Sequence, residues 1–352
     1  MSTLSQKSAP ERTESSAPER TESSAPERTE SSAPERTEKS VPERTENPAT
    51  ERTENSALER PDRPERTRAP EADPAGPPDS PPAPVLALRD VRISDSVTDR
   101  EIVHGVSFEL TPGRTVGIVG ESGSGKTLTC RAALGILPAH FEVSGGSVEI
   151  TGTDIATLTP RRWTELRGAT ISAVFQDPAS YLNPSIRVGA QIAEVIRAKQ
   201  GLKRRAARHH AAELLQAVQL RDPELVYSQY TYELSGGMLQ RVLIAAAIAA
   251  EPRILIADEA TTALDVTVQA EILDLLAELR ERTGLALVVV SHDLAVVAQL
   301  CDEVLVMREG HVVEQGPTRE VLHNPRHEYT RLLIAEHDQY GLEKFLAPQE
   351  AS

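Results

Sequence analysis

Aromatic residues are scarce in this sequence, and the first 84 of its 352 residues contain none. The same segment holds 15 of the 25 prolines. Such a segment cannot bury enough apolar surface to offset the entropy lost when its backbone is ordered. We therefore predict a disordered tail over residues 1–84, which leaves the rest of the chain to form the folded core.

Long hydrophobic runs are also absent. The longest clean one, near Val242–Ala250, is far shorter than the ~20 apolar residues that span a bilayer. The first residues, MSTLSQKSAPER, offer no apolar stretch for a signal peptide. We exclude an integral membrane protein and expect the chain to stay in the cell.

The sequence contains few cysteines and fewer basic than acidic residues. The two cysteines, Cys130 and Cys301, lack the spacing of a disulfide or metal framework, which favours buried free thiols in a reducing cytoplasm. The 38 Lys and Arg are outnumbered by 53 Asp and Glu, giving a formal net charge of −15. Because an acidic chain repels phosphate backbones, we predict no nucleic-acid partner.

The tail is a tandem repeat. The unit SAPERTES begins at Ser8, Ser16 and Ser24 and decays in later copies to Asn55. Eight residues with only Ala and Pro as apolar positions are too few to stack as a solenoid, so we expect an extended flexible arm. A docking tether is one interpretation, and a start of translation downstream of the repeats is another. We favour neutral repeat expansion.

Sequence typical of a nucleotide-binding core begins at Val85. The stretches VLALRDVRI and IVHGVSFEL alternate as strands do, and a third strand covers Val116–Val119. A loop matching G-x-x-x-x-G-K-[ST] follows, and a helix then runs to Leu137-Pro138. The glycines let several N–H groups face a phosphate, the lysine reaches the β/γ-phosphates, and the threonine hydroxyl binds Mg²⁺. These residues are Gly120, Glu121, Ser122, Gly123, Ser124, Gly125, Lys126 and Thr127.

Two further segments suit the same chemistry. Asp258 and Glu259 follow the apolar strand RILIA, so Asp258 is predicted to hold Mg²⁺ and Glu259 to accept a proton from the attacking water. Leu234–Met238 reads LSGGM before a helical run. Ser235 suits an N-cap, while Gly236 and Gly237 leave the helix start bare for an anion.

These segments resemble the motifs of ATP-binding cassette (ABC) ATPases. LSGGM is similar to the signature motif, Gln176 in VFQDP to the Q-loop, Ala263-Leu264-Asp265 to the D-loop, and His292 in VVVSHD to the switch histidine. The resemblance implies an α/β P-loop NTPase fold with a RecA-like core, an antiparallel β subdomain and an α-helical subdomain. It also implies that two cassettes sandwich two ATP molecules, with Ser235, Gly236 and Gly237 of one facing Lys126 of the other.

The residues also support independent interpretations. Gln176, at a strand end, can reach the metal and the attacking water, and His292 can orient that water or polarise the γ-phosphate. Asp265 can join the subunit interface and also cap the helix that follows it. The resemblance also implies an aromatic side chain in the first strand region that stacks on adenine. Ile93–Ile102 contains no aromatic residue, so Val97 or His104 becomes the candidate.

Other details resemble the oligopeptide, dipeptide and nickel importer group: LSGGM, FQDP-x-x-x-LNP and HNPRHEYTRLL at His323–Leu333. This implies an ATPase subunit on the cytoplasmic face of the membrane. Its partners would be transmembrane permease subunits, a second ABC ATPase subunit, identical or paralogous, and indirectly an extracytoplasmic substrate-binding protein. The chain stops after GLEKFLAPQEAS without the cysteine-bearing segment common among the peptide group, which shifts some weight towards nickel or other small solutes. The expected function is to energise an importer for peptides or for nickel and other small solutes.

The domain expectation is a tail over 1–84, an ABC ATPase domain over 85–337 with its helical subdomain at about 177–245, and a C-terminal tail over 338–352. The basic stretch Lys203–His210 is interpreted as a solvated helix face, in preference to a lipid or partner contact. Glu303–Gly316 reads as a hairpin at a sheet edge. Two other functions remain open: a soluble ABC ATPase with a mechanical role, and an exporter subunit.

Overall fold

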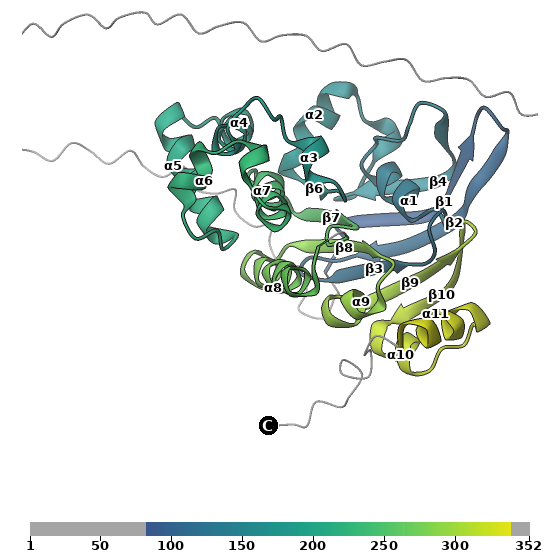
Figure 1. Cartoon of the computed structure of the whole chain (residues 1–352). Helices are drawn as coiled ribbons and strands as arrows, with labels where there is room; N and C mark the ends of the chain where they lie inside the picture. Colours follow the sequence, from purple (N-terminus) through teal and green to yellow (C-terminus); the bar gives the residue numbers. More distant parts are fainter. Residues whose placement is uncertain (1–81, 263, 339–352) are drawn as a thin grey trace, which may run out of the picture. The chain divides into compact units, whose positions relative to one another are not determined.

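The computed structural model describes residues 82–262 and 264–338 (Figure 1). The predicted disordered tail lies outside them except for its last three residues, as do Ala263 and the end of the predicted C-terminal tail. None of the helices within the described ranges is long and apolar enough to cross a membrane.

A four-stranded antiparallel sheet, ordered β2-β1-β4-β5, opens the fold. Its first two strands confirm those predicted from alternation, and Leu86 pairs with Leu110 across them. The β1–β4 pair continues the sheet on the other edge of β1. The strands are β1 (Leu86–Asp95), β2 (Arg100–Leu110), β4 (Phe141–Ile150) and β5 (Thr153–Asp154).

The second sheet has six strands in the order β10-β9-β3-β8-β7-β6, and all its pairs but β9–β10 are parallel. Every residue of β3, β7 and β8 is buried, as expected where both faces of a parallel sheet are covered. The strands are β3 (Thr115–Val119), β6 (Ile171–Val174), β7 (Ile254–Asp258), β8 (Ala286–Ser291), β9 (Glu303–Arg308) and β10 (His311–Pro317).

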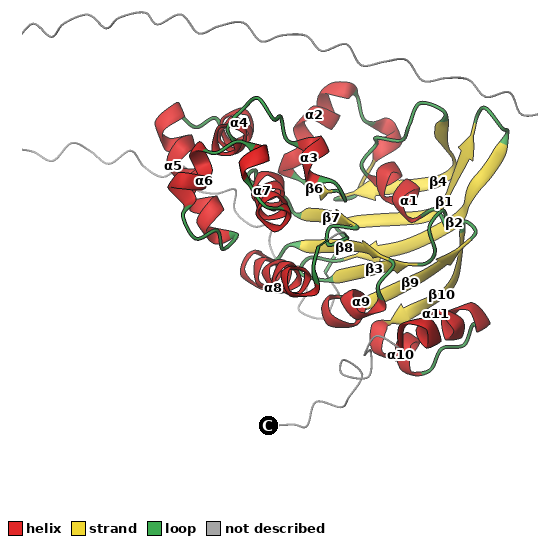
Figure 2. Ribbon diagram, viewed as in Figure 1, coloured by secondary structure: helices red, strands yellow, loops and turns green. Residues whose placement is uncertain are grey.

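Two hydrophobic cores lie on opposite faces of this sheet. Ile254 and Ile256 of β7 belong to the core shared with the antiparallel sheet and α1, whereas Leu255 and Ala257, which alternate with them, belong to the core on the side of the larger set of helices. Figure 2 shows the helices and the antiparallel strands around the central sheet. This alternation follows from the two-residue period of a strand. The central sheet is therefore held between two layers, and its strand ends are fixed in position.

The first helix is shorter than predicted. It ends at Ala133, not at Leu137-Pro138, because Gly135 takes a positive φ of 61° and closes the helix there. The α-helices are α1 (Lys126–Ala133), α2 (Pro160–Ala169), α3 (Pro178–Tyr181), α4 (Val188–Gln200), α5 (Arg204–Ala217), α6 (Pro223–Ser228), α7 (Gly236–Ile248), α8 (Val266–Thr283), α9 (Leu294–Leu300), α10 (Thr318–His323) and α11 (Glu328–Asp338). Helix α5 contains most of the basic stretch, and β9 and β10 form the predicted edge hairpin.

Candidate functional site

The loop between β3 and α1 has the backbone shape of a phosphate cradle. Gly120 has φ 147°, and a Cβ there would lie 2.0 Å from the carbonyl oxygen of Met307. Gly125 has φ 97° and is the N-cap of α1, with no side chain capping the helix. The N–H groups of the first turn of α1 are consequently left for an anion, as the glycine pattern predicts.

Lys126 curls back over this loop. Its Nζ donates to the carbonyl oxygens of Gly120 (2.7 Å) and Glu121 (2.8 Å). Burial lowers the pKa of Lys126, while the nearby carboxylates Glu259 and Asp258 act to raise it. The Oγ of Ser124 is buried and has no hydrogen-bond partner within the described residues. An orphaned hydroxyl and a buried ammonium beside bare N–H groups fit a bound phosphate.

Asp258 ends β7 beside the start of α1. The Thr127 hydroxyl donates to Asp258 Oδ1 at 3.1 Å, which joins two residues predicted to share Mg²⁺. Burial raises the pKa of Asp258, and the neighbouring Glu259 adds to the effect. Groups of three or more His, Cys, Asp or Glu able to hold a metal are absent from the described residues. One carboxylate and one hydroxyl suit an ion whose remaining ligands are phosphate and water oxygens.

Glu259 and His292 lie next to each other at the ends of β7 and β8. Glu259 Oε1 is 3.8 Å from His292 Nδ1, and its other carboxylate oxygen accepts from Thr262 Oγ1 at 3.3 Å. Glu259 has φ 50°, a sparsely populated conformation for a non-glycine residue, and its N–H donates to the Val290 carbonyl at 3.0 Å. Such conformations cluster at functional sites because the surrounding structure must hold them.

Gln176 completes this group from the end of β6. It lines a cavity of about 260 Å³ together with Thr127, Asp258 and Glu259. Arg131, on the last turn of α1, lines the same cavity. Sequence reasoning missed this arginine. Counting one helical turn from Thr127, the predicted Mg²⁺ ligand, would have placed it near the acids.

The signature residues start α7 on a separate surface. Ser235 Oγ accepts from the Met238 N–H at 3.4 Å, which confirms the predicted N-cap. Asp265 caps α8 by accepting from the Val268 N–H at 3.0 Å. Within the described residues, no hydrogen bond joins Ser235, Gly236 or Gly237 to the loop at Gly120–Thr127.

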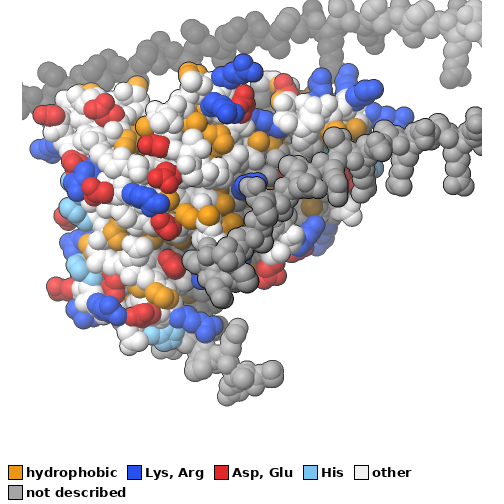
Figure 3. Space-filling view, turned by 180° about the vertical axis from the view of Figure 1, so that it is seen from behind, with side chains coloured by type: hydrophobic (Ala, Val, Ile, Leu, Met, Phe, Trp, Pro, Cys, Tyr) orange, Lys and Arg blue, Asp and Glu red, His pale blue; other side chains and the backbone are white. Residues whose placement is uncertain are grey.

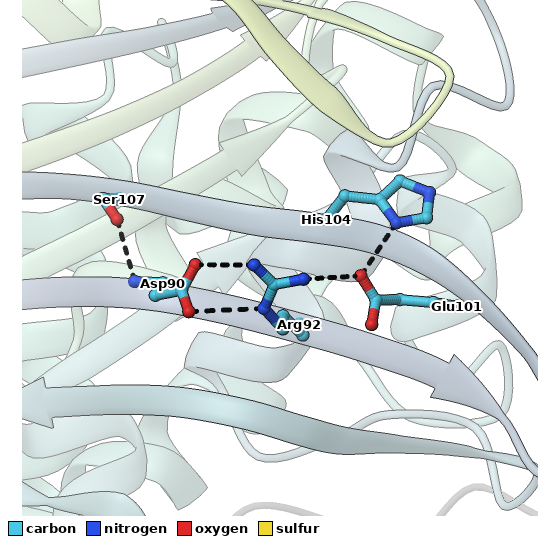
Figure 4. Close-up of polar contacts among 5 residues, drawn as sticks. All are labelled: Asp90, Arg92, Glu101, His104 and Ser107. Atoms are coloured by element: carbon cyan, nitrogen blue, oxygen red, sulfur yellow. Dashed lines mark hydrogen bonds and ion pairs between the residues drawn. The ribbon is translucent and has the colours of Figure 1, made fainter.

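The two adenine candidates differ in their surroundings. Val97 is 79% exposed at the tip of the β1–β2 hairpin. His104 is held in a polar chain on β1 and β2, in which Glu101 Oε1 lies 2.8 Å from its Nδ1 and accepts from Arg92 at 3.1 Å (Figure 4). Its ring stacks on that of His311, with centroids 4.2 Å apart.

Two contacts at the loop come from the C-terminal part of the chain and were missed. The Tyr329 hydroxyl accepts from the Glu121 N–H at 3.0 Å, and the Gly310 N–H donates to the Ser124 carbonyl at 3.1 Å. Tyr329 belongs to the HEYT stretch, which the sequence marks only through its family pattern. The β9–β10 turn, predicted only as part of a sheet edge, therefore also contacts the phosphate loop.

Comparison with known proteins gives a consistent family. The sequence matches the family described as ABC transporter over residues 103–262. A probable D,D-dipeptide transport ATP-binding protein of Escherichia coli (strain K12) is 42% identical over 268 residues, covering 75% of this chain and 82% of that protein. An oligopeptide transport ATP-binding protein of Bacillus subtilis (strain 168) is 42% identical over 256 residues, covering 71% of each.

Solved structures agree with the sequence relatives. One is cbiO1 from Clostridium perfringens, part of the ABC transporter complex cbiONQ, with a TM-score of 0.61 and 26% identity over 74% of this chain and 99% of that one. Another is the ATP-binding cassette MJ0796, a dimer in a post-hydrolysis state bound to ADP and Pi. Its TM-score is 0.59 and its identity 28%, over 66% of this chain and 98% of that chain.

Proposed function

Because this chain belongs to the family of ABC transporter ATP-binding proteins, we propose that it powers the import of peptides through separate membrane-spanning subunits. The chain binds and hydrolyses ATP as its family does. Peptides are favoured over nickel because the relatives are named for dipeptide and oligopeptide transport. The proposal places the subunit on the cytoplasmic face of the membrane, beside a permease pair that a substrate-binding protein supplies.

The observation that supports hydrolysis best is the grouping of Lys126, Thr127, Asp258, Glu259 and His292 at one edge of the central sheet. We assign the phosphates to the N–H groups of the Gly120–Thr127 loop, with Ser124 Oγ as a further donor. The Lys126 ammonium is then free to leave its two carbonyl partners for the phosphate oxygens. The loop supplies binding and orientation, which is most of what phosphoryl transfer requires.

Asp258, Thr127 and Gln176 are the residues assigned to Mg²⁺, which neutralises charge on the phosphates when it is bound. Glu259 is assigned as the group that takes the proton from the attacking water. Its carboxylate lines the same cavity as Thr127 and Gln176, so a water there lies within its reach. His292, 3.8 Å from Glu259 and 56% exposed in its side chain, has room to turn toward a phosphate.

Closure is assigned to two cassettes meeting head to tail. Helix α7 begins at the signature residues Ser235, Gly236 and Gly237. Among the described residues, the phosphate loop of the same chain does not bind the N–H groups at this helix start. A second cassette, either this chain or a paralogue, would bring its Lys126 loop opposite them, with Asp265 at the interface. ATP between the two halves favours the closed state, and that preference is what drives a permease between its conformations.

Glu259→Gln tests the assignment. Removing the base should lower ATP hydrolysis by about 10²- to 10⁴-fold while leaving ATP binding intact. ATP-bound closed dimers should then accumulate, and light scattering with and without Mg-ATP measures them. An exposed acid far from the site, Glu213→Gln in α5, is the matched control.

The result also distinguishes the two pairing modes. Dimers formed with Mg-ATP mean that this chain supplies both halves of each site. A monomer that binds ATP but stays monomeric points to a paralogous partner cassette. Full hydrolysis by Glu259→Gln would contradict the role of Glu259 and return the search for the base to His292.

Peptide import is tested in membranes. The subunit is combined with its permease and binding protein in vesicles, and dipeptides, oligopeptides and Ni²⁺ are offered separately. We expect peptides to stimulate ATP hydrolysis and to accumulate inside. Stimulation by Ni²⁺ alone would contradict the peptide assignment but not the ATPase assignment.

A further inference from the structure

The phosphate-binding loop is fastened from its outer side by C-terminal residues. Glu121, the second residue of the loop, donates its N–H to the Tyr329 hydroxyl at 3.0 Å, across 208 positions of sequence. Tyr329 lies on α11, which Figure 1 shows beside β10. The family match covers only residues 103–262, so Tyr329 lies in a part of the chain beyond it.

Tyr329 is itself held firmly. It is 4% exposed, its ring lies under the Arg308 guanidinium at 5.0 Å, and its N–H donates to His327 Nδ1 at 3.1 Å. Burial raises the pKa of the Tyr329 hydroxyl, so the group stays neutral at physiological pH. A fixed and neutral hydroxyl oxygen is a well-placed acceptor for a single backbone N–H.

The segment that leads into α11 is anchored to the central sheet. The Glu314 carboxylate on β10 accepts from the N–H groups of Arg326 (2.8 Å) and His327 (3.0 Å). Strand β10 pairs with β9, and β9 pairs with β3, the strand that leads into the loop. The Tyr329 hydroxyl is therefore fixed in the same frame as the loop that it contacts.

The proposed turn of Lys126 toward the phosphates makes this contact matter. In the structure the lysine donates to the carbonyls of Gly120 and Glu121 and so holds the start of the loop. Once its ammonium turns to a phosphate, both carbonyls lose that donor. The contact from the Glu121 N–H to Tyr329 does not involve the lysine, so it can hold the loop in either arrangement.

We propose that Tyr329 is a positioning residue for nucleotide binding, which holds the start of the phosphate loop in place when Lys126 leaves it for the phosphates. The inference rests on the assignment of that loop to ATP. Tyr329 does not touch the reacting atoms, so it acts on nucleotide affinity and leaves the chemical step unchanged. The alternative is that Tyr329 only fills the core beneath Arg308.

Tyr329→Phe separates the two roles because it keeps the ring and removes one oxygen. Tyr227→Phe on α6 is the matched control: its ring also lies near an arginine, with the Arg208 guanidinium at 4.7 Å, and it is remote from the loop. Both variants are made in the full chain. The measurements are the Kd for a fluorescent ATP analogue with ADP competition, kcat and KM for ATP, and the Tm without nucleotide.

We expect Tyr329→Phe to weaken nucleotide binding and raise KM by about threefold to tenfold, the effect of one neutral hydrogen bond. Its kcat should remain within about twofold of the wild type, and its nucleotide-free Tm should fall by no more than about 4 °C below that of Tyr227→Phe, because one hydrogen bond is lost and the ring packing is unchanged. Amide hydrogen exchange in the peptide that contains Glu121 should be faster in Tyr329→Phe alone.

Three results would overturn the inference. Nucleotide affinity equal to wild type in Tyr329→Phe would mean that the hydroxyl does not position the loop, while the ATP site itself would stand. A loss of Tm that accounts for the whole loss of affinity would identify a core-filling role. Absence of ATP binding in the wild type would overturn this inference and the assigned site together.

Discussion

Asp258 meets two opposing demands at one side chain. It must be ionised to hold a cation, yet it is only 5% exposed, and burial disfavours the charged form. The Thr127 hydroxyl compensates in part by donating to it. The raised pKa of Asp258 is thus the cost, in folding stability, of placing a metal ligand inside the sheet edge.

This conflict predicts a trade between stability and activity in Asp258→Asn. A carboxyl whose pKa is raised by folding stabilises the fold at pH below its unfolded value, and that contribution is lost as the pH rises through the folded value. At neutral pH the ionised Asp258 is therefore destabilising. The amide removes this charge and can still accept from Thr127. We expect a higher nucleotide-free Tm at pH 7 and a loss of Mg-dependent hydrolysis of about a hundredfold or more.

The pH dependence provides the check. The gain in Tm should shrink as the pH falls toward about 4, where the unfolded carboxyl also takes up its proton. Asp99→Asn, at an exposed turn position, is the control and should show neither effect. A gain in Tm that is the same at every pH would mean that charge burial is not its source.

Single residues differ in how far the sequence reveals them. Lys126, Thr127 and Glu259 are predictable because each sits at a fixed offset from a glycine or a strand end, and local geometry then determines where it points. Tyr329 is not, since its proximity to the site depends on how α11 packs against the sheet. Tertiary contacts of this kind leave no local spacing to read.

At the scale of elements, the start of α7 carries two adjacent glycines with different surroundings. A Cβ on Gly236 would meet only Leu264 Cδ2, at an ordinary 3.8 Å, whereas a Cβ on Gly237 would lie 2.7 Å from Val268 Cγ1 on α8. Gly237 thus allows α7 and α8 to approach closely. Within the described residues, nothing in the chain's own packing demands glycine at position 236.

This difference predicts opposite outcomes for two small changes. Gly236→Ala should leave the stability of the monomer unchanged or raise it by up to about 1 kcal/mol, since alanine favours a helix. It should weaken ATP-dependent dimer formation at least about tenfold, because the added methyl would stand where a phosphate is expected. Gly237→Ala should instead lower the stability of the monomer by about 1–3 kcal/mol through overpacking.

Urea unfolding and light scattering in a Glu259→Gln background measure the two effects. Each alanine variant serves as the control for the other, since both change the same helix turn by one methyl group. Unimpaired dimers in Gly236→Ala would argue against a phosphate site at the start of α7.

Most elements were predictable for a physical reason. The alternation in β1 and β2 and the continuous apolar runs in β3, β7 and β8 follow from burial on one face or on both. The predicted end of α1 was wrong because Gly135 closes the helix before the proline. A Cβ on Gly135 would lie 2.4 Å from the Trp163 ring, a contact that the sequence does not reveal.

At the scale of the whole molecule, the acidic charge is not confined to the repeats. On the face in Figure 3, Lys and Arg side chains are interspersed with Asp and Glu. The first 84 residues hold 12 cationic and 18 anionic side chains, so they contribute −6 to the formal net charge of −15. The rest of the chain carries the remaining −9. The acidic balance of the core is therefore independent of the repeats.

The first strand of the described fold begins at Leu86, just after the predicted end of the tail. The Val85 N–H donates to the Leu110 carbonyl at 2.8 Å, and Leu86 is fully buried, so the sheet begins at the boundary where the sequence changes character. Deleting residues 2–81 should thus leave the Tm within about 2 °C of the full chain, and kcat and KM for ATP within about twofold. Calorimetry and a coupled ATPase assay measure these quantities.

The same deletion decides between a neutral repeat and a docking tether. A neutral repeat predicts unchanged peptide uptake in permease-containing vesicles, whereas a tether predicts slower uptake with the same ATPase activity in solution, because only recruitment to the permease would suffer. A chain with the tail residues shuffled controls for length and charge. Its uptake would equal that of the full chain if any acidic arm of this length suffices, and would equal that of the deletion if a partner recognises the repeat sequence. We expect equal uptake by all three chains, since the first strand of the described core begins at Leu86 and pairs with β2 from there on.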